Sequence, residues 1–313
     1  MLRNFFFFVL LWSGVSGVIK AQSSNTAFTV LVWNIWHGGN DESLPEDGRP
    51  HVIDIIRASE ADVVLMIETY GSAPMIAEAL DFDYHLISSN LCIFSRYPIT
   101  RHFAFEEAIA PFNFGGVEIQ VEDSIPVLFF DTWLHYLPDT RLAPTDSTGA
   151  DMIAWEKRGS REEEIEAILG AIEPFIEKAD EMPIIMGGDF NSHSHLDWTP
   201  ATRDTFFHGG AVVDWPISRA MTDVGFKDAF RQMYPDPLTH PGTTWLSVNV
   251  DGERQFVRKD RIDYLYYTGE KLQLIQAESR VAPDGQPFTF RGKQLMYPSD
   301  HGFVLATFEI QPD

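Results

Sequence analysis

Short runs of apolar and β-branched residues recur along the chain, and several of them end in a polar residue. Residues 29–34 and 62–68 are two such runs, and Arg49–Ser59 between them carries apolar side chains at helical spacing. Strands and amphipathic helices differ in the period of their apolar positions, so this order predicts a strand, a helix and a second strand.

The middle of the chain predicts a meander of short strands followed by one long helix. A helix is expected at 74–80, and strands are expected at 84–88, 91–94, 100–105, 117–121 and 126–134. From 151 to 172, apolar residues at helical spacing predict one amphipathic helix with the charged residues 161–164 facing solvent. Pro174 should end or kink this helix.

The last third adds a strand that runs into Asp189, a loop-rich segment from 192 to 245, and closing strands at 261–267, 272–278 and 302–310. Mixed strands and helices of this kind predict an α/β protein with two packed sheets flanked by helices. The polar residues at the strand ends should then meet in one cleft.

Composition and charge narrow the possibilities. With 44% hydrophobic residues the chain of 313 residues can bury a large core, and no linker or repeat divides it, so one domain is expected. The formal charge of −23 repels polyanions, which argues against a protein that coats nucleic acid. It does not exclude an enzyme whose metal ion neutralises a single phosphate.

The first residues have the pattern of a signal peptide: one positive charge, a short apolar stretch and a small-residue zone near Ala21-Gln22. We therefore expect residues 1–22 to be a cleaved leader and residues 23–313 to be an exported domain, periplasmic or extracellular. The apolar run is shorter than the ~20 residues of a membrane-spanning helix, so no transmembrane segment is expected after cleavage. Cys92 is the sole cysteine and is expected to be buried and apolar.

Four of the strand ends offer oxygen ligands or proton carriers. They are Asn34, Glu68, the sequence Gly187-Gly188-Asp189-Phe190-Asn191 and the sequence Ser299-Asp300-His301-Gly302. Oxygen ligands without a cysteine cluster suit a hard cation such as Mg²⁺ or Mn²⁺. Phosphoryl transfer needs such a cation, a positioned water and donors to the phosphoryl oxygens, so phosphoester chemistry is predicted.

These residues resemble, in order, the motif set of the endonuclease/exonuclease/phosphatase superfamily with its deoxyribonuclease I-like fold. The motifs are Asn34, Glu68, Ser95-Arg96-Tyr97-Pro98-Ile99, His135, Gly188-Asp189-Phe190-Asn191, Arg261-Ile262-Asp263-Tyr264 and Ser299-Asp300-His301. The resemblance covers about residues 28–310. It implies a four-layered α/β sandwich and a metal-dependent phosphoesterase.

The resemblance also implies roles for the acidic and amide residues. Glu68 would be the main metal ligand, with Asn34 beside it and Asp300 completing the set. Asp189 would orient and help deprotonate the attacking water, and Asn191 would hold that water or the phosphate. Ile67 and Trp36 stand where some relatives carry Gln and a second metal carboxylate, so one ion is expected.

The histidines receive roles from the same resemblance. His135 and His301 would donate to phosphoryl oxygens or serve in acid–base steps, and Asp263 would fix the tautomer of the His301 ring. A structural role for His135 stays open, because Trp133 occupies the position where many relatives have a histidine. His37 has no visible partner in the sequence and is expected to be structural.

Three residues are weaker candidates for substrate contact. His195 and Trp198 lie in the loop after Asn191 and would form part of the pocket wall, and Arg96 would support a loop or contact the phosphate. His193 and His195 could alternatively form a His-x-His zinc pair. Surface-loop positions remain a further alternative for this segment.

The predicted function is thus an exported divalent-metal-dependent phosphodiesterase acting on a small or single phosphodiester. No stable nucleic-acid complex is expected. A secreted nuclease and a sphingomyelinase-like phospholipid phosphodiesterase use the same motif set and remain alternatives. A zinc hydrolase centred on His193 and His195, and a non-catalytic exported binding protein on the same fold, are the remaining ones.

Overall fold

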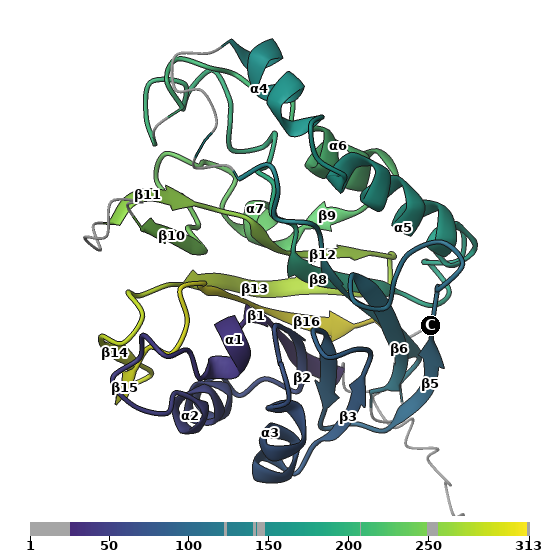
Figure 1. Ribbon diagram of the computed structural model, residues 1–313. Coiled ribbons are helices and arrows are strands. Elements are labelled where there is room, and N and C mark those ends of the chain that lie inside the picture. The colour runs from purple at the N-terminus through teal and green to yellow at the C-terminus, as the bar shows by residue number, and fades with distance from the viewer. Residues whose placement is uncertain are drawn as a thin grey trace, which may run out of the picture.

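The computed structural model describes residues 26–121, 124–139, 142, 148–206, 208–248 and 256–311. Two six-stranded sheets dominate these residues, and they pack face to face (Figure 1). The expected leader, residues 1–22, lies outside the described residues, so its assignment stays a prediction. No helix in the described ranges is both long and apolar enough to cross a membrane.

The first sheet contains both ends of the described chain. Its strands, in spatial order, are β13 (Leu272–Arg280), β16 (Phe303–Ile310), β1 (Thr26–Asn34), β2 (Val63–Ile67), β4 (Cys92–Ser95) and β3 (Asp83–Leu86). β1 runs parallel to β2 and antiparallel to β16, with Asn34 opposite Ile67 and Trp33 opposite Phe303. Residues that follow β1 and β2 therefore emerge at the same edge of the sheet.

The second sheet is built from the middle of the chain. Its order is β5 (Ile99–Phe103), β6 (Phe114–Gln120), β7 (Pro126–Trp133), β8 (Ile184–Asp189), β12 (Asp263–Thr268) and β9 (Lys227–Asp228). β8 is parallel to β7 and antiparallel to β12, with Asp189 opposite Asp263. Two small hairpin-like ladders complete the strands, β10 (Trp245–Val248) with β11 (Phe256–Asp260) and β14 (Pro287–Phe290) with β15 (Lys293–Met296).

Helices cover the outer face of each sheet, so the molecule has four layers (Figure 1). α2 (Arg49–Ser59) and α3 (Ala73–Leu80) pack on the first sheet, and α5 (Arg161–Ile176) and α6 (Pro216–Asp223) pack on the second. The shorter helices are α1 (Trp36–Gly39), α4 (Gly149–Glu156) and α7 (Ala229–Met233). The predicted four-layered α/β sandwich with two mixed sheets is confirmed.

Alternation along the strands explains this layering. On β1, Val30 and Val32 point into the core between the sheets, whereas Leu31 and Trp33 point toward α2 and α3. On β7 the odd residues face the first sheet and the even ones, such as Phe130, face α5. Strands buried on both faces read as continuous apolar runs, which is the pattern of the sequence here.

One predicted helix is wrong in its extent. The segment expected as one helix from 151 to 172 forms two helices, α4 and α5, separated by residues 157–160. Pro174 lies in the last turn of α5, where it removes one N–H without ending the helix.

The expected outward orientation of Arg161 is also wrong. Its side chain is fully buried, and its guanidinium reaches back to the carboxylate of Glu156 at 2.6 and 2.7 Å. A buried arginine is tolerated only with such a partner, because charge in an apolar interior otherwise costs several kcal/mol. The turn between the two helices brings the pair together.

Candidate active site

The polar residues predicted at strand ends meet where the two sheets open at one edge. Asn34 ends β1, Glu68 follows β2, Asp189 ends β8 and Asp263 begins β12. All four side chains are at least nine-tenths buried. The edge therefore gathers buried acids from segments far apart in sequence.

Asn34 joins the two sheets at this edge. Its Nδ2 donates to Glu68 Oε1 at 3.1 Å and to Asp189 Oδ2 at 3.2 Å. The other Glu68 oxygen accepts from the His37 backbone N–H at 3.1 Å. Glu68 has a positive φ of 60°, a conformation that is uncommon for a residue with a Cβ and that often marks functional positions.

His301 lies beside Asp189, with Asp263 behind it. Its Nδ1 is 3.0 and 3.1 Å from the two Asp263 oxygens, and its Nε2 is 3.9 Å from Asp189 Oδ2. Because a carboxylate only accepts, Nδ1 carries the proton and Nε2 faces Asp189. Burial alone lowers the pKa of His301, but the carboxylates of Asp263, Asp300 and Asp189 outweigh it and raise this pKa well above its usual value.

One carboxylate oxygen of Asp300 accepts a hydrogen bond and the other accepts none from the described residues. Its Oδ2 accepts from Trp245 Nε1 at 3.2 Å. Its Oδ1 is buried, is 4.0 Å from His301 Nε2, and makes no hydrogen bond to any residue in the described ranges. A buried carboxylate oxygen without a donor is a costly arrangement that a cation would relieve. With Glu68 nearby, Asp300 therefore fits a hard divalent ion.

Asp189, Asp263 and His301 are a second arrangement that could hold a metal ion, since one ligand atom from each lies within 4.8 Å of the others. Both oxygens of Asp263 are, however, directed at Nδ1 of His301, so a metal there would take away that proton's acceptor. The Glu68 and Asp300 side of the site therefore suits an ion better. Burial raises the pKa of Asp189 to about 8, although His301 opposes the shift.

The glycines before Asp189 let the two sheets and β7 approach closely. A Cβ on Gly188 would lie 1.9 Å from Thr132 O, and Gly188 has φ +150°; a Cβ on Gly187 would lie 2.4 Å from Val32 Cγ2 in the other sheet. Both positions thus require glycine. Close approach of the backbones places Asp189 within reach of Asn34.

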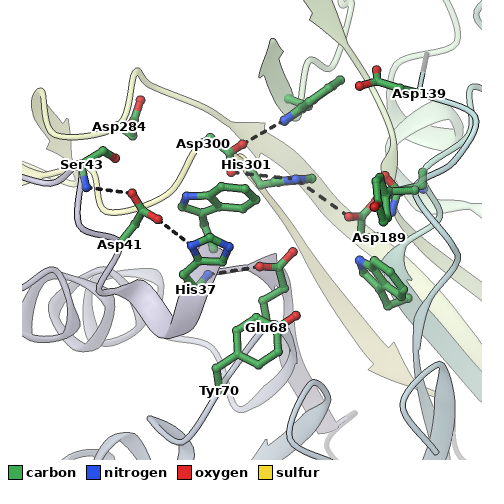
Figure 2. Close-up of a pocket in the computed structure, with 15 residues that line it drawn as sticks. His37, Asp41, Ser43, Glu68, Tyr70, Asp139, Asp189, Asp284, Asp300 and His301 are labelled. Carbon is green, nitrogen blue, oxygen red and sulfur yellow. Dashed lines mark hydrogen bonds and ion pairs between the residues drawn. The ribbon is translucent and has the colours of Figure 1, made fainter. Parts of the chain in front are cut away.

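A cavity of 640 Å³ opens above these residues, and most of its outer lining was not predicted (Figure 2). Five aromatic residues line it, namely Trp36, Tyr70, Trp133, Tyr136 and Trp245. Three further acids, Asp41, Asp139 and Asp284, also line it. One signal could have found part of this lining, because Trp36, Tyr70 and Tyr136 each follow a strand end by a few residues.

His37 also lines the cavity, and it has a partner that was not visible in the sequence. Its Nδ1 pairs with Asp41 Oδ2 at 2.5 Å, and its ring stacks on Trp36 with centroids 4.1 Å apart. The partner was missed because His37 and Asp41 lie on opposite sides of a turn with positive φ at Gly38 and Gly39.

The structure does not bring His135 into the cavity lining. Its Nδ1 accepts from Leu137 N at 3.2 Å, and its ring stacks on Tyr136. Trp133 and Tyr136, on either side of it, line the cavity instead. The predicted catalytic role of His135 is therefore not supported, because the loop after β7 turns its ring onto its own backbone.

The predicted substrate contacts of Arg96, His195 and Trp198 are likewise not supported. Arg96 pairs with Asp62 at the far end of β2 from Glu68. Trp198 is buried in a small apolar cluster with Trp215, and His195 bonds to Ser218 Oγ at 2.8 Å. None of the three lines the cavity.

The His-x-His zinc pair does not form a metal cluster among the described residues. The His193 ring packs against Trp198 and Trp215, with centroids 5.1 and 4.9 Å away. His195 faces Ser218 instead. Side chains at positions i and i+2 of this loop thus point into different surroundings.

Comparison with known proteins assigns the family. The model of the Endonuclease/Exonuclease/phosphatase family matches residues 31–301. The chain belongs to this family. Membership identifies it as a phosphoric ester hydrolase that depends on a divalent metal ion.

The chain is similar over most of its length to another protein sequence and to several solved structures. An uncharacterized Caenorhabditis elegans protein is 28% identical over 324 residues, which cover 98% of this chain and 99% of that protein. Truncated TDP2 from Caenorhabditis elegans has a TM-score of 0.57 at 20% identity, covering 90% of this chain and 98% of that one. The human Nocturnin catalytic domain has a TM-score of 0.59 at 15% identity, covering 92% and 96%.

Proposed function

We propose that the protein is an exported phosphodiesterase that hydrolyses a small or single phosphodiester by in-line attack of water. One observation carries the proposal. The amide of Asn34 holds Glu68 and Asp189 together across the two sheets, with His301 beside Asp189. In this proposal Glu68 would bind the metal ion and Asp189 would activate the water, and Asn34 holds the two acids together. The leader pattern of residues 1–22 supports export.

The ion would be held by Glu68 and Asp300, with Asn34 beside them. Mg²⁺ or Mn²⁺ suits these oxygen ligands, and a single ion suits Trp36 standing where a second carboxylate would be needed. When bound, the ion supplies positive charge that stabilises the phosphoryl oxygens in the transition state.

The remaining residues handle the water and the phosphate. Asp189 Oδ2 faces the site and would orient the attacking water and accept its proton. The Asn191 Nδ2 donates to Leu134 O at 2.9 Å, which leaves its Oδ1 to meet the water. His301 Nε2 would donate to a phosphoryl oxygen, with Asp263 holding the opposite side of the ring.

The charge of the cavity lining and of the whole chain supports a small substrate. The cavity lining among the described residues contains no lysine and no arginine, and the chain carries a formal charge of −23. A long nucleic acid needs cations for its flanking phosphates. A nuclease is the second candidate, since TDP2 from D. rerio, which has this fold, was solved with a single-strand DNA product.

Hydrolysis of bis-p-nitrophenyl phosphate tests the proposal. We expect turnover with Mg²⁺ or Mn²⁺ that a chelator abolishes. Glu68→Gln should lower kcat/KM at least about 100-fold, because even outer partners of metal ligands are worth about 10–100-fold. The matched control is Glu46→Gln, whose side chain is exposed and outside the cavity, and it should be unchanged.

Two results would count against the proposal. Turnover that survives the chelator would show that the reaction does not need a metal ion. A fully active Glu68→Gln variant would show that Glu68 is not the main metal ligand. Plasmid and oligonucleotide DNA, assayed beside the diester, test the second candidate. Faster cleavage of DNA than of the diester would favour the nuclease.

A further inference from the structure

The turn that carries Glu68 has an unfavourable backbone conformation. Glu68 has a φ of 60° and Tyr70, two residues later, has a φ of 33°, and both values lie in the left-handed region that residues with a Cβ rarely adopt. Both side chains line the cavity (Figure 2). Because such conformations persist only where neighbouring groups hold them, the turn needs partners outside its own strand.

The tip of the hairpin between β3 and β4 supplies these partners. The backbone N–H of Glu68 donates to the side-chain Oδ1 of Asn90 at 3.0 Å. The next N–H, that of Thr69, donates to the Asn90 carbonyl at 3.0 Å. The N–H of Tyr70 donates to the Ser89 carbonyl at 2.9 Å. Three consecutive backbone donors of the turn are thus bound by two residues of the hairpin tip.

Asn90 is the only side chain that accepts one of these three bonds. It is fully buried, and its Nδ2 donates to Phe112 O at 2.9 Å. A backbone N–H can only donate and a carbonyl can only accept, so one orientation of the amide satisfies both partners. An ionised aspartate would lose the donor and a leucine would lose both groups. The position therefore calls for an amide.

The bond to Phe112 ties the turn to the second sheet. Phe112 lies just before β6, and its ring packs edge-on against Trp133 with centroids 5.6 Å apart. The next residue, Asn113, accepts from Trp133 N at 2.9 Å. Trp133 lines the cavity. Asn90 thus joins the turn that follows β2 in one sheet to the segment that supports the cavity wall in the other.

Two buried asparagines hold different parts of Glu68. Asn34 Nδ2 donates to the carboxylate Oε1 at 3.1 Å, whereas Asn90 accepts from the backbone N–H. The place of the carboxylate depends on both ends of the side chain. A hard divalent ion needs its oxygen ligands at short, well-defined distances, so a shift of the Glu68 backbone should weaken the binding of the ion.

We propose that Asn90 is a positioning residue for the metal site: it holds Glu68 in the left-handed backbone conformation from which the carboxylate binds the divalent ion. The inference rests on the proposed function, since Glu68 is the metal ligand only in that proposal. Asn90 stands outside the motifs on which the family resemblance rests.

The Mn²⁺ affinity of Asn90→Ala tests the inference, measured from the electron paramagnetic resonance signal of free Mn²⁺. The variant leaves the Glu68 N–H without its acceptor. We expect the Kd for Mn²⁺ to rise about tenfold, because partners of metal ligands typically contribute about 10–100-fold. At saturating Mn²⁺, kcat for bis-p-nitrophenyl phosphate should return close to that of the natural protein, because excess ion compensates for weaker binding by mass action.

Ser59→Ala is the matched control. Ser59 is buried, and its Oγ donates to Ile56 O at 2.7 Å and accepts from Ala61 N at 3.2 Å, before the start of β2 and at the opposite end of this strand from Glu68. Losing these bonds should lower stability and leave the Kd for Mn²⁺ unchanged. If Asn90→Ala does not fold, Asn90→Ser takes its place with the same expectation, since its hydroxyl lies one bond closer to the backbone than Oδ1.

The outcomes separate this inference from the function beneath it. If the natural protein does not hydrolyse bis-p-nitrophenyl phosphate with Mn²⁺, the proposed function itself fails. If it does, and the Asn90 variant binds Mn²⁺ as the natural protein does, only the role of Asn90 is overturned. An equal rise of the Kd in Ser59→Ala would also overturn it, because the effect would then be a general loss of stability.

Discussion

At the scale of single residues, Asp131 is a fully buried carboxyl group whose pKa is shifted mainly by burial. It lies on β7 two positions after Phe129, so its side chain points into the core between the sheets. Its carboxyl oxygens make no hydrogen bond to a described residue. Burial raises the pKa of Asp131 well above its usual value, and the nearby amides of Thr132 and Met66 oppose the shift only in part.

Asp131 should therefore make stability fall as pH rises. In the folded state Asp131 keeps its proton at pH values at which it is ionised in the unfolded chain, where its pKa is about 3.9. The stability that Asp131 contributes is therefore fully present below that pH and declines above it. Asp131→Asn removes the titration and should stabilise the protein by about 1–3 kcal/mol at about pH 8, with the gain shrinking toward pH 4. Urea midpoints at several pH values measure it.

The exposed Asp83→Asn serves as the control and should show no such pH-dependent gain. An Asp131→Asn variant whose difference from the natural protein is the same at every pH would contradict the buried, protonated state.

At the scale of elements, the loop after β7 depends on α5. Arg161 Nη1 donates to His135 O at 2.9 Å and its Nη2 donates to Pro138 O at 3.1 Å, while Glu156 neutralises its charge. This fixes the loop that carries Tyr136 at the cavity, directly after Trp133 at the end of β7. The pair thus links the packing of two helices to the shape of the site.

Removing one partner of this buried pair should be costly. Glu156→Gln leaves the Arg161 charge buried without its counterion and should lower the free energy of unfolding by about 3–5 kcal/mol. Glu162→Gln, which breaks the solvent-accessible pair between Glu162 on α5 and Lys157 in the turn before it, should cost no more than about 1 kcal/mol. Denaturant unfolding compares the two, and equal effects would contradict the role of the buried pair.

The elements also show what the sequence could and could not predict. Asn34, Glu68 and Asp189 were found because each directly ends an apolar run, and strand direction then brings them to one edge. Arg161 was assigned outward because three glutamates follow it, while its partner Glu156 belongs to another helix. Periodicity reports one element at a time and cannot show such a contact.

The aromatic lining was missed for a related reason. Trp36 and Tyr70 have positive φ values of 54° and 33°, so the chain turns back just after the strand ends. Alternation along a strand does not extend into such turns. The direction of the Trp36 and Tyr70 side chains depends on the neighbouring strand and not on the residues around them in the sequence.

At the scale of the whole molecule, two sheets pack so that each contributes half of the site. The first sheet carries Asn34, with Glu68 just after its strand β2 and Asp300 just before its strand β16, and the second sheet carries Asp189 and Asp263. Neither sheet alone could act on a phosphoester. In a chain of charge −23, a bound cation is what makes this edge able to accept an anion.

Anomalous scattering from crystals soaked in Mn²⁺ tests this central claim most directly. The account predicts one peak within about 2.0–2.3 Å of carboxylate oxygens of both Glu68 and Asp300. A peak bound by Asp189, Asp263 and His301 instead, or no peak between the two sheets, would contradict it.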